Sequence, residues 1–272
     1  TLSLQTLFRS YDIRHAAKLE GSVGLKHPSI PLPLDMYGTL RKNSKGYDLA
    51  NDTPLAALDS TAQELHNRIW QSHPLLANNE SLEQGHSVAI TNPAQNDEIV
   101  GYVQEADLKH VEIALNAAEQ AQSEWSNTPK QQRAQYLKCA ADLMESRIQE
   151  LMVLLCRESG KTYANAIAEV REAVDFLRYY ATQVENLPAN TAIQPLGTVL
   201  CISPWNFPLA IFSGQIAAAL VSGNCVIAKP AEQTPLIAAQ AVQILWEAGI
   251  PHGAVQLLPG RGETVGAQLS QD

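Results

Sequence analysis

The chain has 272 residues, of which 45% are hydrophobic, and a formal net charge of −9. This length can bury a full core in one or two domains. The negative charge argues against nucleic acid or an anionic membrane as the main partner, and no apolar run reaches the ~18 residues that a transmembrane segment needs. Four cysteines without regular spacing are typical of reduced thiols, so we expect a cytoplasmic protein.

The first part of the chain predicts a connector followed by a helix and a hairpin. Residues 1–52 contain Pro, Gly and Ser without a sustained period, which is typical of a linker. Residues 53–72 carry apolar side chains at helical spacing, with Asp52 or Thr53 as the cap. Residues 87–103 alternate around a turn that contains Asn92-Pro93, so they predict a β-hairpin.

Residues 104–187 predict a helical region. Asp107 is placed to cap a helix that runs to about Trp125. A second helix begins at Thr128-Pro129 and continues to Gly160, because its apolar positions keep to one face. A third helix covers residues 163–186 and ends before Pro188. The seven histidines show no metal-ligand spacing, and we expect no metal site.

The last part predicts a parallel sheet. Three short apolar runs, at residues 198–202, 225–228 and 254–258, each end in a loop rich in Pro or Gly. Segments of helical length separate them, which is the β-α-β-α-β order of an open α/β sheet. Ligands of such sheets bind at the carboxyl ends of the strands, so we expect the three loops to form one site.

Asn206 is the first candidate for catalysis. Pro204 and Pro208 bracket it, and prolines make the backbone extended and stiff. An amide held in this way can donate a hydrogen bond to the oxyanion that forms when a carbonyl is attacked. The alternative is an ordinary proline-rich turn after a strand.

The order of the three loops carries a family resemblance. Ser203-Pro204-Trp205-Asn206-Phe207-Pro208, then Lys229-Pro230-Ala231-Glu232, then the Gly-x-Gly-x-x-x-Gly turn at 260–266 resembles the aldehyde dehydrogenase superfamily. The resemblance covers residues 87–272. It implies an α/β fold with a Rossmann-type parallel sheet and flanking helices, incomplete in this chain.

The resemblance also implies roles for single residues. Asn206 would contribute to the oxyanion hole, and Lys229 and Glu232 would hold the adenosine ribose. A carboxylate there repels a 2′-phosphate and therefore favours NAD over NADP. The alternative for Lys229 and Glu232 is a solvated pair beside a turn. The other implied cofactor contacts are Ile202, Ser203, Pro204, Trp205, Ala231, Gly262 and Gly266.

A second resemblance concerns residues 27–49, which contain His27-Pro28-Ser29 and Arg41-Lys42-Asn43. They are similar to the connector of bifunctional proline-utilisation (PutA) proteins, in which a proline dehydrogenase barrel precedes an L-glutamate-γ-semialdehyde dehydrogenase. This implies a connector at 1–52 and the N-terminal part of an NAD-binding domain at 53–272. It further implies a small aldehyde substrate, a homo-oligomer such as a dimer, and FAD only where the barrel is present.

The cysteines limit what this segment can do. Cys139, Cys156, Cys201 and Cys225 lie in apolar helix or strand patterns, where a thiol is a packing group. We therefore expect a fragment that lacks the family's catalytic cysteine and is inactive by itself. The alternatives are an aldehyde dehydrogenase of other specificity, a non-catalytic NAD-binding remnant, and a structural or oligomerisation piece.

Overall fold

The computed structural model describes residues 29–77, 87–188, 191 and 194–271, and the chain divides into two compact units, Thr1–Asn43 and Ser44–Asp272. In the first unit, η1 (Pro33–Asp35) is a short 3-10 turn, and the Arg41 guanidinium lies 3.8 Å from the centroid of the Tyr37 ring. His27 and Pro28 of the connector motif lie outside the described residues.

The second unit contains the predicted parallel sheet. Its strands are β4 (Thr198–Ile202), β5 (Cys225–Lys229) and β6 (Val255–Leu257), in the order β4-β5-β6 and all parallel. Helix α8 (Ala210–Val221) joins the first two strands and α9 (Pro235–Glu247) joins the last two. Every residue of β5 is buried, which explains its continuous apolar run. The predicted α/β fold is confirmed.

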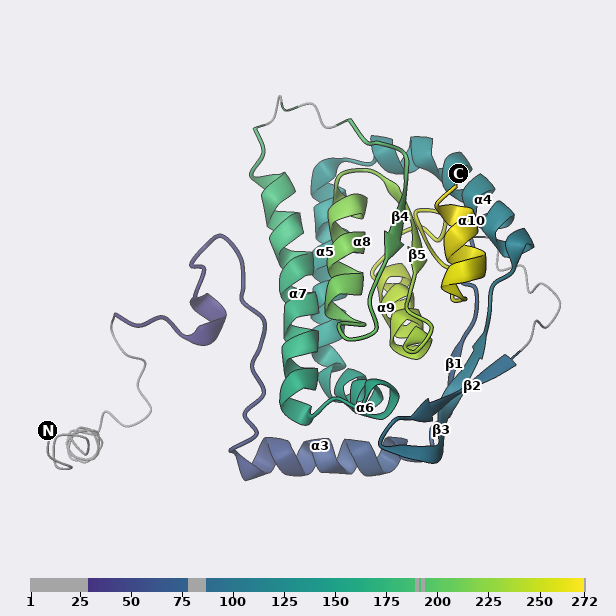
Figure 1. Ribbon diagram of the computed structural model, residues 1–272. Coiled ribbons are helices and arrows are strands. Elements are labelled where there is room, and N and C mark those ends of the chain that lie inside the picture. The colour runs from purple at the N-terminus through teal and green to yellow at the C-terminus, as the bar shows by residue number, and fades with distance from the viewer. Residues whose placement is uncertain (1–28, 78–86, 189–190, 192–193, 272) are drawn as a thin grey trace, which may run out of the picture. The chain divides into compact units, whose positions relative to one another are not determined.

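Helices enclose this sheet on both faces (Figure 1). Helices α8 and α9 lie on one face, as right-handed crossovers between parallel strands require. Helix α4 (Leu108–Asn127) lies on the other face, and α5 (Lys130–Ser146) and α7 (Tyr163–Glu185) pack outside α8. Asp107 caps α4 as predicted, because its Oδ1 accepts a hydrogen bond from the His110 amide at 3.0 Å.

The single helix predicted over 128–160 is wrong, because the structure has two helices there. Helix α5 ends at Ser146, α6 (Ile148–Ser159) follows, and Arg147 lies between them with φ −107° and ψ 19°. Helix α6 turns away from α5 and packs against α7, α9 and α3 (Asp52–Leu65). Both helices bury an apolar face, so the apolar period continues across the break and does not reveal it.

The helix predicted over 53–72 is also too long. Helix α3 (Asp52–Leu65) is capped by Asn51, not Asp52 or Thr53, because the Asn51 side chain accepts from the Thr53 amide at 3.0 Å. Residues Trp70–Ser72 instead form strand β1, which pairs in parallel with β3 (Gln95–Gln104) and buries Trp70. This pairing is long-range, and helical spacing alone could not show it.

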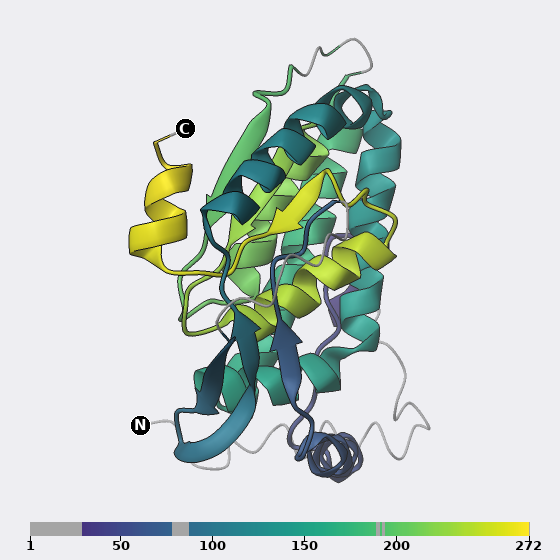
Figure 2. The same cartoon turned by 90° about the vertical axis from the view of Figure 1, so that its right-hand side faces the viewer.

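The predicted hairpin is confirmed as β2 (Ser87–Asn92) and β3 (Gln95–Gln104), which with β1 form a second sheet in the order β1-β3-β2. Figure 2 shows this sheet below the parallel one. Leu75 and Leu257 exchange two backbone hydrogen bonds of 3.0 Å, so the chain after β1 is fastened to β6. None of the helices within the described ranges is long and apolar enough to cross a membrane.

Candidate functional site

The three predicted loops meet at the carboxyl edge of the parallel sheet. The Ser203 amide donates to the Lys229 carbonyl at 3.2 Å, which joins the ends of β4 and β5. The Leu258 amide donates to the Ala228 carbonyl at 2.9 Å, which joins the ends of β5 and β6. Every residue predicted for the site therefore lies on one edge, where ligands of α/β sheets bind.

The loop between β4 and α8 presents its polar and aromatic side chains to solvent. Asn206 is exposed, and Trp205 and Phe207 beside it are 55% and 41% exposed. The neighbouring Ser203 and Pro208 are buried and anchor the loop. Since the Asn206 side chain is not packed in the fold, it is available to a ligand or to a reacting oxygen.

Lys229 and Glu232 form the second part of the site, with the glycine turn against them. Lys229 is 4% exposed, and burial lowers its pKa, against the raising effect of Glu232, Glu263 and Glu105. Its stem passes over Gly266, where an added Cβ would lie 3.3 Å from the Lys229 Cε atom. A larger residue at position 266 would therefore make a tight contact that the lysine stem would have to shift to relieve.

Glu232 links the second loop to the third. Its Oε1 atom accepts a hydrogen bond from the Gly262 amide at 2.7 Å, while the residue as a whole stays exposed. Gly262 opens η2 (Gly262–Gly266), which is one π-helical turn and is followed by the short α10 (Ala267–Leu269). The wider turn brings Gly266 under Lys229 and keeps Gly262 against Glu232.

These residues fit a dinucleotide. Each oxygen of a carboxylate has two lone pairs, so Glu232 can keep its bond to Gly262 and still accept from two ribose hydroxyls. The hydroxyls of Ser203 and Thr234 are buried at this edge without a hydrogen-bond partner among the described residues. Ile202, Pro204 and Ala231 are partly or fully exposed on the same loops.

Three of the four cysteines do not suit a nucleophile. Burial raises the pKa of the Cys201 thiol to about 12 and the pKa values of Cys156 and Cys225 to about 11. A thiol attacks as the thiolate, so these three side chains are inert near neutral pH. Among the described residues, no group of three or more His, Cys, Asp or Glu is placed to hold a metal ion.

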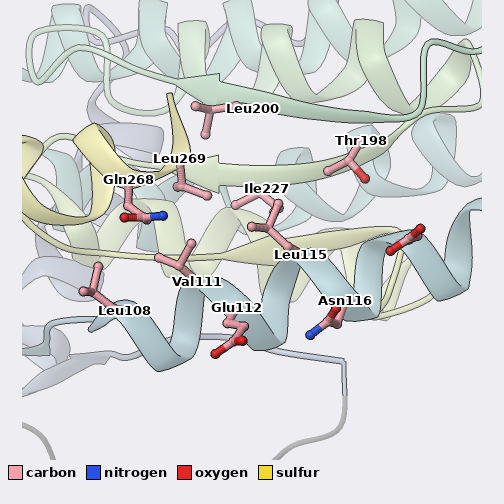
Figure 3. Close-up of a pocket in the computed structure, with 11 residues that line it drawn as sticks. Leu108, Val111, Glu112, Leu115, Asn116, Thr198, Leu200, Ile227, Gln268 and Leu269 are labelled. Carbon is pink, nitrogen blue, oxygen red and sulfur yellow. The ribbon is translucent and has the colours of Figure 1, made fainter. Parts of the chain in front are cut away.

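A cavity of about 750 Å³ lies on the α4 face of the sheet (Figure 3). Its floor is apolar, with Val111 and Leu115 from α4 facing Leu200 and Ile227 from the strands. The charged side chains in its lining are Glu112 and Glu119, which would repel a pyrophosphate. None of the predicted site residues is among those that line this cavity in the described chain.

Three residues of the site's support were missed by the sequence analysis. Lys161 donates to the Asn206 carbonyl at 2.8 Å, and Glu158 and Glu169 accept from amides at the starts of α9 and α8. The sequence predicts a helix end at Gly160, which the structure confirms, but it gives no role to Glu158 and Lys161 on either side of that glycine. Glu169 had a signal, because it falls on the same helical face as the apolar Ala166, Val170 and Ala173.

Comparison with known proteins shows the family of this chain. The profile of the aldehyde dehydrogenase family matches residues 80–272. The chain belongs to this family. It is 57% identical over 260 residues to "Bifunctional protein PutA" of Escherichia coli strain K12, a match that covers 96% of this chain and 20% of the relative. This aldehyde dehydrogenase segment thus spans about a fifth of the length of such relatives.

Two solved structures are similar to this aldehyde dehydrogenase segment. Proline utilization A from Bdellovibrio bacteriovorus has a TM-score of 0.81 and 32% identity, and the match covers 94% of this chain and 28% of that one. A 1-pyrroline-5-carboxylate dehydrogenase from Thermus with bound NAD has a TM-score of 0.79 and 32% identity, covering 90% of this chain and 48% of that one.

Proposed function

We propose that this segment supplies the NAD-binding and oxyanion-stabilising parts of an enzyme that oxidises L-glutamate-γ-semialdehyde to glutamate in proline catabolism. The proposal rests mainly on one observation: Asn206, Glu232 and the glycine turn lie at the same edge of the parallel sheet. The chain that brings them together belongs to the aldehyde dehydrogenase family. The names of the relatives, PutA and 1-pyrroline-5-carboxylate dehydrogenase, support the choice of aldehyde.

Each residue has a distinct role in this proposal. Asn206 donates a hydrogen bond to the aldehyde oxygen as negative charge develops on it, an interaction worth roughly 100- to 1,000-fold in rate. Glu232 accepts from the ribose hydroxyls and disfavours a 2′-phosphate, and Lys229 holds the same sugar. Gly262 and Gly266 let the backbone approach the pyrophosphate. NAD would supply the acceptor for the hydride, the hydrogen with its electron pair, that leaves the aldehyde carbon.

The attacking thiol is assigned to a residue outside positions 1–272. Burial and the raised pKa values of Cys156, Cys201 and Cys225 support this assignment. We further propose a cytoplasmic enzyme that works as a homodimer. In a PutA-type arrangement, residues 1–52 would be the connector to a proline dehydrogenase barrel, and FAD would belong to that barrel.

A hybrid enzyme tests the proposed function. This segment replaces the matching residues of the Escherichia coli relative, and NADH formation is followed with L-glutamate-γ-semialdehyde and with acetaldehyde. We expect activity with the first substrate and much less with the second. Asn206→Ala should lower turnover by roughly 100- to 1,000-fold, because one oxyanion donor is lost.

The control is Asn127→Ala, which removes an exposed asparagine at the end of α4 whose side chain, among the described residues, bonds only to the local Ser123 carbonyl. Its turnover should match that of the parent hybrid. A folded hybrid that binds NAD and oxidises neither aldehyde would replace the proposal with a non-catalytic nucleotide-binding module. A folded hybrid that binds no NAD would point to a structural piece.

A further inference from the structure

Helix α8, which follows the Asn206 loop, takes its cap from another helix. Its own N-cap residue, Leu209, has an apolar side chain that cannot accept a hydrogen bond. Glu169 of α7 takes this place, because its Oε2 atom accepts from the amides of Leu209 at 3.2 Å and Ala210 at 2.9 Å. Glu169 is only 2% exposed, so the end of the loop is fixed to a buried carboxylate.

Lys161 fixes the middle of the same loop. Its Nζ atom donates to the backbone carbonyl of Asn206 at 2.8 Å and lies 3.4 Å from the Oε1 atom of Glu169. The ammonium group is also 5.3 Å from the centroid of the Phe207 ring, on the next residue of the loop. Lys161 therefore joins the buried carboxylate to the residue that carries the candidate oxyanion donor.

We propose that Lys161 and Glu169 are positioning residues that set the direction of the Asn206 amide; this inference rests on the proposed function. No side-chain hydrogen bond joins Asn206 to the rest of the described chain, so its backbone must hold its orientation. That backbone is attached at Asn206 by Lys161 and at Leu209 by Glu169. A donor stabilises an oxyanion strongly only when it is oriented before the charge develops.

The lysine charge is essential to this arrangement. A hydrogen bond from an ammonium to a carbonyl is stronger than one between neutral groups. The ammonium also compensates the charge of Glu169, which without it would be buried unpaired. Replacing Lys161 by Met keeps the length of the stem but removes both contacts. Replacing it by Arg keeps a cationic donor.

NMR relaxation tests this proposal by measuring how rigid the backbone of the Asn206 loop is. The measurement uses the whole 272-residue chain without NAD. The amides of Asn206 and Phe207 should have order parameters near those of rigid backbone, ~0.85, and fall below ~0.6 in Lys161→Met. Glu169→Gln should give the same loss at these amides, because Lys161 loses its ionic partner. Lys161→Arg should restore most of the order.

The matched control is Lys138→Met. Lys138 is on α5, and its Nζ atom lies 2.6 Å from the Oε2 atom of Glu185 at the end of α7. The substitution should leave the amides of Asn206 and Phe207 unchanged. Unchanged order in Lys161→Met would overturn the proposal, and so would an equal loss of order in Lys138→Met.

The kinetic part of the test uses the hybrid enzyme. Lys161→Met should lower kcat at least tenfold while the KM for NAD changes less than twofold, because the oxyanion donor is displaced and the ribose contacts remain. A rise in the KM for NAD without a fall in kcat would contradict the positioning role. If the parent hybrid is inactive, the proposed function fails, whereas the NMR result still decides whether Lys161 orders the loop.

Discussion

Two loops carry Asn206 and Glu232, and the helix that follows each loop is capped by a buried glutamate from a neighbouring helix. The two glutamates have different surroundings. Glu169 uses one oxygen for two amides at the start of α8, and its other oxygen faces Lys161. Glu158, at the end of α6, uses one oxygen for the Leu236 amide at 2.6 Å and the other for the Ile237 amide at 2.9 Å.

The difference affects how each carboxyl group is charged. Burial raises the pKa of Glu158 to about 8, even though its two amide donors act in the opposite direction. Glu169 has an ammonium group at 3.4 Å as a partner for its charge. The loop with Asn206 is therefore held by an ion pair, and the loop with Glu232 is held by a carboxyl group that takes up a proton near neutral pH.

Both arrangements leave the loop residues free for the ligand. An N-terminal cap normally comes from a Ser, Thr, Asp or Asn of the loop itself. Leu209 cannot play this part, and Thr234 makes no capping hydrogen bond within the described chain. Because the caps come from Glu169 and Glu158, the polar side chains of the two loops can face the site.

The largest effect is expected for Glu169→Ala. It removes the acceptor for two buried amides and leaves Lys161 without its partner, which should lower the free energy of unfolding by about 3–5 kcal/mol. Urea denaturation measures this change. Glu172→Ala, three residues further along α7 and exposed, should stay within about 0.5 kcal/mol of the parent chain. A loss below 1 kcal/mol for Glu169→Ala would show that α8 does not depend on this cap.

A smaller and pH-dependent effect is expected for Glu158→Gln. The folded-state pKa of about 8 lies above the ordinary value of 4.5, so the folded chain holds a proton that the unfolded chain releases. The contribution of Glu158 to stability is therefore complete below about pH 4.5 and declines as the pH rises to about 8. Glutamine does not titrate, so the variant should lack this decline.

Urea midpoints between about pH 5 and pH 8 measure that slope. Glu64→Gln, an exposed position on α3, is the control and should keep the slope of the parent chain. Equal slopes in the parent chain and in Glu158→Gln would mean that Glu158 is ionised in the folded state, and the contrast between the two loops would disappear.

The sequence predicted the three strands of the parallel sheet, and the loops that follow them, for a local reason. Runs such as residues 225–229 are apolar, of strand length and followed by proline, and the site residues stand directly after them. The supports of the loops depend instead on distant pairs: Glu158 bonds to an amide 78 residues away, and Glu169 to one 41 residues away. The strand at Trp70 and the break at Arg147 were missed because both are set by tertiary packing.

The proposed NAD site at the edge of the parallel sheet is tested most directly by finding which backbone amides NAD protects from exchange. Hydrogen exchange of the 272-residue chain is measured with and without NAD, and again for Glu232→Ala. We expect slower exchange at residues 203–206, 229–232 and 262–266 when NAD is bound, and no protection in Glu232→Ala. Protection in the cavity between α4 and α10 instead, or equal protection in Glu232→Ala, would contradict it.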